Sequence, residues 1–487
     1  MGVTEKLAQF IVETPAGSIP PAAIASAKLR FLDTLGVTVA GSRHDSARIA
    51  RDTASLLGGH AQVTLIGRPD RTSVELAGFV NGVAAHALEY DDYTRRVTHL
   101  SASLVPGALA VAEYAGLTGR RMLEGFVIGF QVATHISKGL GSQLFDRGWH
   151  SPCLLGAFGV TAASCRLLGL DVMQTRMALG ITASEASGIR KNVGSMGKAF
   201  HVGHAVRCGI FSALLASRGF KVDPDAIEGV DDGIAGHVRF GLAETFNGAG
   251  NYSLEKMAQD LGAAWELADN TTVVRMHPGH TAASSAIDGM VDLAQAHDLL
   301  PEQVERIELE CTTQAMKLGS YREADDGHKA RFCLPYSMAI ALIDRKAGLD
   351  QYTDQRVRSA DVQALMRRVD VRVPPDLKHH HGAWTGGVNW GEMRLSVNLK
   401  DGRRLSVARS SARGWPEQPA TWGDIAGKYE ECCTGILDPV QIKASIEQVG
   451  ILEDAASLQP LVRSLCASIE HQPERVCEPL KPFSFGE

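Results

Sequence analysis

The residues best equipped for chemistry stand together at residues 86–99, which read HALEYDDYTRRVTH. This stretch holds three carboxylates, two arginines and two histidines between two small-residue, apolar segments, 74–88 and 104–115, that are predicted to be buried helices. Burying such charges is costly unless they pair with one another or meet a charged ligand. The stretch therefore indicates a site that moves protons beside an anion; the alternative is a solvated loop with ordinary helix caps.

A second polar segment, residues 190–204, is basic, is spaced by glycines and leads into a predicted helix. Helix N-termini and nearby cations attract carboxylates and phosphates. The spacing fits neither a P-loop nor a Rossmann fingerprint, so a nucleotide is not indicated. This segment predicts a place for a small anion, and its alternative is a basic loop that caps the helix.

Three shorter motifs place histidine, arginine and tyrosine at predicted helix starts, although each also suits an ordinary core position: Trp149-His150-Ser-Pro, His277-Pro-Gly-His280 and Arg331-Phe-Cys-Leu-Pro-Tyr336. The triplet His379, His380 and His381 cannot turn all its rings to one ion and lacks a partner at ligand spacing, so we predict a solvated loop and no metal site. No GxSxG elbow is present. The remaining side chains suit proton transfer next to a carboxylate, with imidazoles to move the proton and cations to hold the charge.

The composition excludes several classes of protein. A net charge of −6 argues against non-specific nucleic-acid binding, which needs a basic face. The nine cysteines are scattered without a paired framework, as is typical of a reducing compartment. We see no signal peptide and no apolar run of membrane-spanning length, and we therefore expect a cytoplasmic protein that binds neither nucleic acid nor membrane.

The elements that must position these residues change character along the chain. Helical patterns dominate to about residue 219 and return after residue 422. Between them, alternating runs end in Asp401-Gly402, the strongest local signal for a β-hairpin. We predict a mainly α protein: a large all-helical domain over residues 1–270 and 420–487, with a smaller α+β lid domain, residues 271–419, inserted into it. A small-molecule site would lie between the two.

The motifs together resemble the MmgE/PrpD family, which includes 2-methylcitrate dehydratase, cis-aconitate decarboxylase and iminodisuccinate epimerase. The most specific ones are HALEYDD at 86–92, LGAFG at 155–159, GSMGK at 194–198 and FCLPY at 332–336. The resemblance implies a cofactor-free homodimer with its site between the helical domain and the lid. It also implies six active-site positions: His99, Glu89, Lys198, His150, His280 and Tyr336.

The chain departs from the usual family pattern near the substrate. His99 is followed by Leu-Ser, Tyr93 stands where a small residue is common, and Arg95 and Arg96 replace more neutral residues. We expect the substrate to be contacted by Tyr93, Arg95, Arg96, Ser195 and His201.

From these motifs we predict a lyase that acts next to a carboxylate of a small di- or tricarboxylic acid. His99 would be the acid or base, and Glu89 would orient it. Lys198 and His280 would hold carboxylates and the charge that develops on them, and Tyr336 and His150 would bind substrate or protonate a leaving hydroxyl. Dehydration of the 2-methylcitrate type is placed first, with decarboxylation of the cis-aconitate type or epimerisation as alternatives. From another class, the protein could be a non-catalytic relative that binds a carboxylate.

Overall fold

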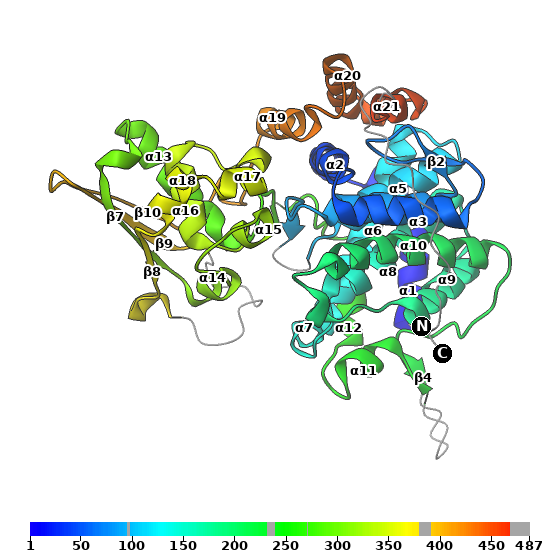
Figure 1. The fold of residues 1–487 in the computed structure, drawn as a ribbon. Coiled ribbons are helices and arrows are strands. Elements are labelled where there is room, and N and C mark those ends of the chain that lie inside the picture. The colour runs from blue at the N-terminus through cyan, green and yellow to red at the C-terminus, as the bar shows by residue number, and fades with distance from the viewer. Residues whose placement is uncertain (95–97, 231–238, 270, 379–390, 468–487) are drawn as a thin grey trace, which may run out of the picture.

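The computed structural model describes residues 1–94, 98–230, 239–269, 271–378 and 391–467, and it is mainly α, as predicted. Its buried hydrophobic residues form two large cores, seen as two lobes in Figure 1. The first core draws on residues 3–274 and 425–467, and the second on residues 282–399. The chain therefore leaves the first core near residue 274 and returns to it after residue 400. That the second lobe acts as a lid stays a prediction.

Helices build the first lobe. Before the crossing to the second lobe these are α1 (Val3–Glu13), α2 (Pro21–Gly41), α3 (Asp45–Leu57), α4 (Val74–His86), α5 (Ser101–Tyr114), α6 (Gly119–Leu140), α7 (Gln143–Asp146), α8 (Ser151–Leu168), α9 (Val172–Glu185), α10 (Met196–Ser217), α11 (Leu242–Asn247) and α12 (Leu254–Ala258). After it come α19 (Trp422–Cys433), α20 (Pro439–Gly450) and α21 (Gln459–Ser464). Three two-residue ladders accompany them: β1 (Val63–Thr64) with β2 (Arg71–Thr72), β3 (Tyr93–Thr94) with β6 (Thr272–Val273), and β4 (Gly229–Val230) with β5 (Arg239–Phe240).

Small residues let these helices approach closely. A Cβ on Gly82 of α4 would lie 2.9 Å from the Cα of Gly203 in α10. A Cβ on Gly203 would lie 2.5 Å from the carbonyl oxygen of Phe79. The contact between α4 and α10 matters because both helices carry site residues.

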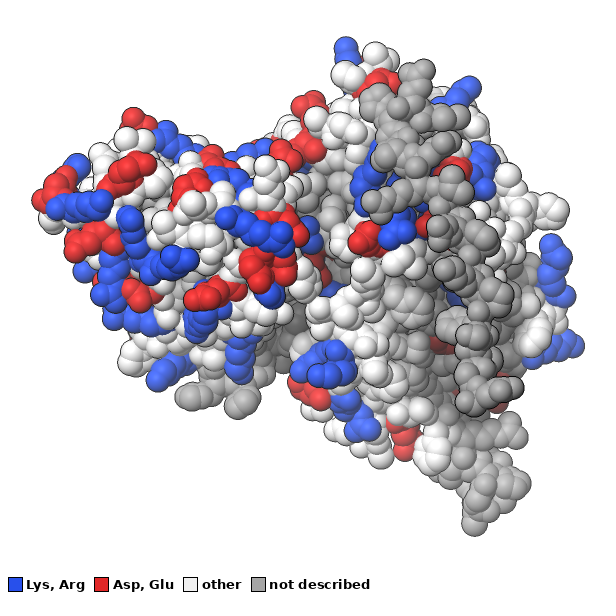
Figure 2. All heavy atoms as spheres, viewed as in Figure 1, with Lys and Arg blue, Asp and Glu red and all other residues white. Residues whose placement is uncertain are grey.

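The second lobe is a four-stranded sheet with helices on one face. The strand order is β10-β9-β7-β8, with β7 and β8 parallel and the other pairs antiparallel. Inward residues such as Ile307 and Leu309 join the core, whereas Glu308 and Glu310 form ion pairs with arginines on the outer face. Figure 2 shows basic and acidic side chains intermixed over this lobe. Its elements are α13 (Ser284–Ala296), β7 (Val304–Cys311), α14 (Thr313–Leu318), α15 (Gly327–Ala330), α16 (Leu334–Ile343), α17 (Asp354–Val357), α18 (Ala360–Met366), β8 (Val369–Arg372), β9 (Met393–Leu399) and β10 (Arg404–Arg409).

Two helices, α8 and α10, are long and apolar enough to cross a membrane by length and composition. However, 83% of the apolar window of α8 and 67% of that of α10 are buried inside the fold. Both pack against other helices of the first lobe, α8 against α6 and α10 against α4. Their apolar character is accounted for by that packing.

Candidate active site

Residues 86–99 span the connection between α4 and α5, and contacts on both sides hold the backbone of this connection. Helix α4 ends at His86, and Glu89 adopts a left-handed backbone with φ 54°, which is costly for a residue with a side chain. Tyr93 then pairs with Val273 in the β3–β6 ladder. This ladder brings Arg275, two residues further on, against the connection.

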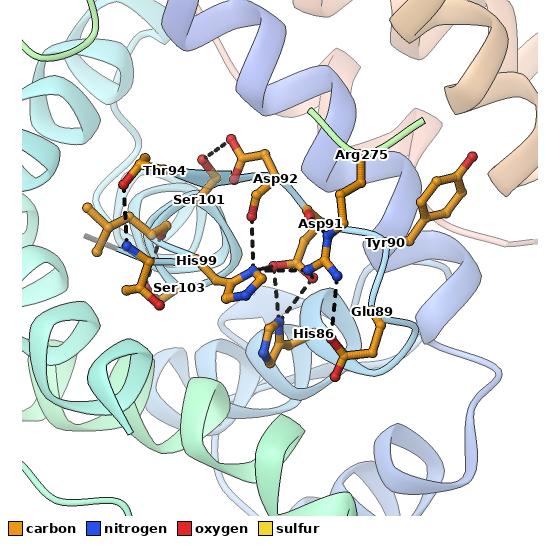
Figure 3. A network of polar contacts seen from close by, with 12 residues as sticks. His86, Glu89, Tyr90, Asp91, Asp92, Thr94, His99, Ser101, Ser103 and Arg275 are labelled. Carbon is orange, nitrogen blue, oxygen red and sulfur yellow. Dashed lines mark hydrogen bonds and ion pairs between the residues drawn. The ribbon is translucent and has the colours of Figure 1, made fainter. Parts of the chain in front are cut away.

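Asp91 is the centre of the site (Figure 3). Its carboxylate lies 3.0 Å from Nδ1 of His86 and 2.9 Å from Nδ1 of His99. Arg275 donates from Nη2 to Asp91 Oδ1 at 3.2 Å and from Nε to the Asp91 carbonyl at 2.7 Å. Burial alone would raise the pKa of Asp91, but the neighbouring histidines and Arg275 hold it well below its ordinary value. Asp91 is therefore a buried carboxylate shared by two imidazoles and a guanidinium.

These contacts bear on the tautomer of His99. Its Nδ1 lies 2.9 Å from the Asp91 carboxylate and 3.1 Å from the carbonyl oxygen of Asp92, which can only accept, and 3.0 Å from Nη2 of Arg275, which can only donate. The two acceptors include the nearest of these three atoms. We infer that Nδ1 carries the proton and that Nε2 is left to exchange protons. Burial, only partly opposed by Asp91, lowers the pKa of His99 to about 4, so the ring is neutral near pH 7. The orienting role predicted for Glu89 belongs to Asp91, because Asp91 is the residue that reaches Nδ1.

Glu89 instead pairs with Lys198, and Figure 3 shows its second contact, with Arg275. Both carboxylate oxygens of Glu89 lie within hydrogen-bonding distance of Lys198 Nζ, and Oε2 is 3.4 Å from Nη1 of Arg275. Burial would raise the pKa of Glu89, but the charges of Lys198 and its neighbours hold it well below its ordinary value. Lys198 lies in the first turn of α10, where Ser195 is the N-cap and accepts from the backbone of Gly197 at 3.1 Å.

Four histidines form a row through the site. The ring centroids of His99 and His86 are 4.8 Å apart, those of His86 and His150 6.5 Å, and those of His150 and His201 4.9 Å. His150 precedes α8 and His201 lies in α10, and their Nδ1 atoms are 2.9 Å apart, so one donates to the other. Burial lowers the pKa of both rings, that of His201 to about 4.

The segment that enters the second lobe continues the site. Gly279 donates its N–H to the carbonyl of Glu89 at 3.0 Å, and His280 donates its N–H to the carbonyl of Arg331 at 3.2 Å. Both ring nitrogens of His280 are buried and have no hydrogen-bond partner among the described residues. Burial lowers the pKa of His280 to about 4.

The other predicted positions are placed differently. Tyr93 is buried with its ring centroid 5.8 Å from that of His99. Tyr336 lies within the second core and donates its hydroxyl to the carbonyl of Gln351; no described contact joins it to Asp91 or His99. Arg95 and Arg96 lie outside the described residues, as do His379, His380 and His381.

A buried lysine that sequence reasoning missed, Lys428, holds the connection between α4 and α5 in place. Lys428 of α19 forms an ion pair with Asp33 of α2 at 2.7 Å. Its Nζ also donates to the carbonyls of Tyr90 at 2.7 Å and of Arg275 at 2.8 Å. Lys428 therefore fixes both segments that meet at Asp91. Asp91 lies within the polar stretch 86–99 and Arg275 lies two residues before the motif that begins at His277, whereas no local signal pointed to Lys428.

The ligand atoms of His86, Asp91 and His99 lie within 4.8 Å of one another, close enough to consider a metal ion. The guanidinium of Arg275 already contacts Asp91 and lies 3.0 Å from Nδ1 of His99. A cation bound there would face this positive charge, so the residues present do not suit a metal.

Comparison with known proteins gives the same family throughout. The MmgE/PrpD N-terminal domain matches residues 5–240, and the MmgE/PrpD C-terminal domain matches residues 277–453. A cis-aconitate decarboxylase from Mus musculus is 25% identical over 95% of this chain and 93% of its own length. Its counterpart from Homo sapiens is 26% identical over 93% of this chain and 92% of its own length. A third, from Aspergillus terreus, is 24% identical over 95% of this chain and 96% of its own length.

These matches confirm the resemblance inferred from the motifs and, with it, the prediction of an enzyme of the lyase class. Both domains of the family are present and lie in the expected order. The chain belongs to the MmgE/PrpD family.

Proposed function

We propose that this protein is a cofactor-independent lyase that removes carbon dioxide from a small tricarboxylic acid of the cis-aconitate type. One observation carries the proposal: a neutral imidazole, His99, is oriented by the Asp91 carboxylate beside the cations Lys198 and Arg275. The similarity to cis-aconitate decarboxylases supports decarboxylation over the dehydration that was placed first from the sequence.

The reaction needs a proton donor beside a carboxylate. In cis-aconitate, the bond between the CH2 group and its carboxylate breaks, and the electron pair forms a new CH2=C bond. The pair of the former double bond moves to the carbon next to the third carboxylate, which takes up one proton as carbon dioxide leaves. We assign this proton to Nε2 of His99. A bound polyanion favours the protonated ring, so the pKa of His99 rises from about 4 when substrate binds.

Incubation with cis-aconitate and, separately, with 2-methylcitrate in deuterated water tests the proposal by NMR. We expect carbon dioxide and a dicarboxylate with a terminal methylene and one deuterium from cis-aconitate. Loss of water from 2-methylcitrate alone would make the protein a dehydratase. Deuterium exchange without bond cleavage would make it an epimerase, and no change in any acid would favour a non-catalytic binder.

We also propose that the protein is a cytoplasmic homodimer. Large apolar side chains are exposed on the neighbouring helices α3 and α10, a pattern that marks an interaction surface. They are Ile49, Leu56, Leu57, Met196, Phe200 and Phe211. Sedimentation equilibrium should give twice the mass of the chain, and a monomer at micromolar concentration would refute the dimer.

A further inference from the structure

The charges around Asp91 balance one another before any substrate binds. Lys198 is paired with Glu89, and Arg275 is shared between Glu89 and Asp91. Two cations thus face two carboxylates. A substrate with two or three negative charges needs a further cation that is not already neutralised.

Arg331 is such a cation. Its side chain forms no ion pair or hydrogen bond with the described residues, and its Nε is buried without a partner. Burial lowers the pKa of Arg331, and the charge of Glu89 opposes this effect, in keeping with a guanidinium beside the site. Arg331 is half-buried, and a cation without a partner at such a place is unfavourable, so it indicates a place that an anion fills.

The backbone places Arg331 next to the site. The N–H of His280 donates to the carbonyl of Arg331. The N–H of Gly279, the residue before His280, donates to the carbonyl of Glu89. Gly279 has φ 107°, and a Cβ there would lie 2.4 Å from the carbonyl oxygen of Arg331. Close backbone contacts therefore connect Glu89 in the first lobe to Arg331 in the second, through Gly279 and His280.

His280 strengthens the case because its ring packs near an aromatic side chain while its nitrogens have no polar partner among the described residues. Its ring lies 6.4 Å from that of Phe332, at an interplanar angle of 14°. Both of its nitrogens lack a partner among the described residues. The buried imidazole of His280 and the buried Nε of Arg331 lie on segments joined by one backbone hydrogen bond. Each offers one N–H donor that has no partner among the described residues.

We propose that Arg331 and His280 form a second carboxylate-binding subsite, which holds a carboxylate of the substrate that does not react. This deepens the proposed function and rests on it only for the identity of the substrate. The guanidinium offers paired N–H donors that match a carboxylate, and lysine does not copy that geometry. The subsite selects acids with at least two carboxylates and aligns the reacting one with His99.

Calorimetric titration with propane-1,2,3-tricarboxylate tests the subsite, because this saturated acid has no double bond to take up the electrons of decarboxylation. In Arg331→Met the dissociation constant should rise about 10- to 150-fold, the range for a charged hydrogen bond. His280→Gln should raise it about 2- to 10-fold, and Arg331→Lys should fall between wild type and Arg331→Met. The matched control is Arg306→Met, which removes an exposed partner of Asp370 in the same lobe and should leave binding within about twofold of wild type.

The unliganded proteins supply a second measurement. Because the half-buried guanidinium has no partner among the described residues to lose, Arg331→Met should unfold at the same temperature as wild type or higher. A lowered midpoint would indicate a structural role and overturn the proposal, as would unchanged binding in Arg331→Met or no binding of the tricarboxylate by wild type. If cis-aconitate is not decarboxylated but the tricarboxylate binds through Arg331, the subsite stands and the proposed reaction falls.

Discussion

Replacing Asp91 by asparagine tests which of two carboxylates, that of Asp91 or that of Glu89, orients His99. The amide of the Asp91→Asn variant would keep the shape of the side chain but offer a single acceptor oxygen and an NH2 group that can only donate. His86 and His99 both direct Nδ1 at this carboxylate, so at least one of them loses its acceptor, and Arg275 loses a charge partner. Replacing the carboxylate behind a catalytic histidine by an amide costs about 10⁴ in kcat. Breaking a buried ion pair costs about 3–5 kcal/mol of stability.

The assay follows turnover of cis-aconitate by NMR, together with the free energy of unfolding in urea. The control is Asp401→Asn, which removes an exposed partner of Arg403 and should leave both the free energy of unfolding and kcat close to those of wild type. Nitrogen NMR should find the proton of His99 on Nδ1 in wild type and on Nε2 in Asp91→Asn. If Asp91→Asn keeps kcat within about tenfold of wild type while Glu89→Gln loses turnover, Glu89 orients the ring and our reasoning is wrong.

Three further predictions rest on the geometry of the site and its helices, and a fourth rests on the sequence. His280 has an ordinary pKa of 6.5 and one of about 4 when folded, so the unfolded chain binds more protons in between; its contribution to stability is complete above about pH 6.5 and is lost as the pH falls to about 4. His280→Asn should therefore make the pH dependence of unfolding in urea shallower by up to about 1.4 kcal/mol per pH unit, and an unchanged slope would contradict the lowered pKa. Gly203→Ala should destabilise by about 1–3 kcal/mol in the same assay because its Cβ meets the carbonyl of Phe79 at 2.5 Å, and a neutral effect would mean that α4 and α10 can separate. Activity should survive exhaustive dialysis against EDTA, whereas loss of turnover restored by a divalent ion would point to a metal at His86, Asp91 and His99. Replacing Arg95 and Arg96 by lysine and by methionine should cost about 1.5–3 kcal/mol in kcat/KM at one position only, and two silent positions would remove these arginines from the substrate site.

The helices and strands could be predicted from local patterns because the buried face of each element requires apolar residues at the repeat of a helix or of a strand. Alternation over residues 307–311 and 393–399 predicted β7 and β9, and Asp401-Gly402 forms the turn into β10. The apolar residues of 455–469 predict a helix that begins at residue 455, and this start is wrong. Helix α21 begins at Gln459, because Pro460 has no N–H and is tolerated only in the first turn.

The site was predictable only as a set of candidates. The polar residues of 86–99 indicated that charges would be buried together, but not which of them would pair. Asp91 and Glu89 are both acidic and two positions apart, and the choice between them as partner of His99 depended on the left-handed turn at Glu89 and on Lys198 reaching it from α10.

The rest of the site depends on segments far apart in the chain. Arg275 meets Asp91 across 184 positions, and Lys428 meets Tyr90 across 338. Periodicity reports which side of an element is buried, since that depends on residues three or four positions apart. It carries no information on which distant segment supplies the opposite charge. The amino-acid sequence by itself therefore determined the elements, the family and the residue types at the site, whereas the packing of two lobes decided that Asp91 holds His99 and that Arg331 is left without a partner among the described residues.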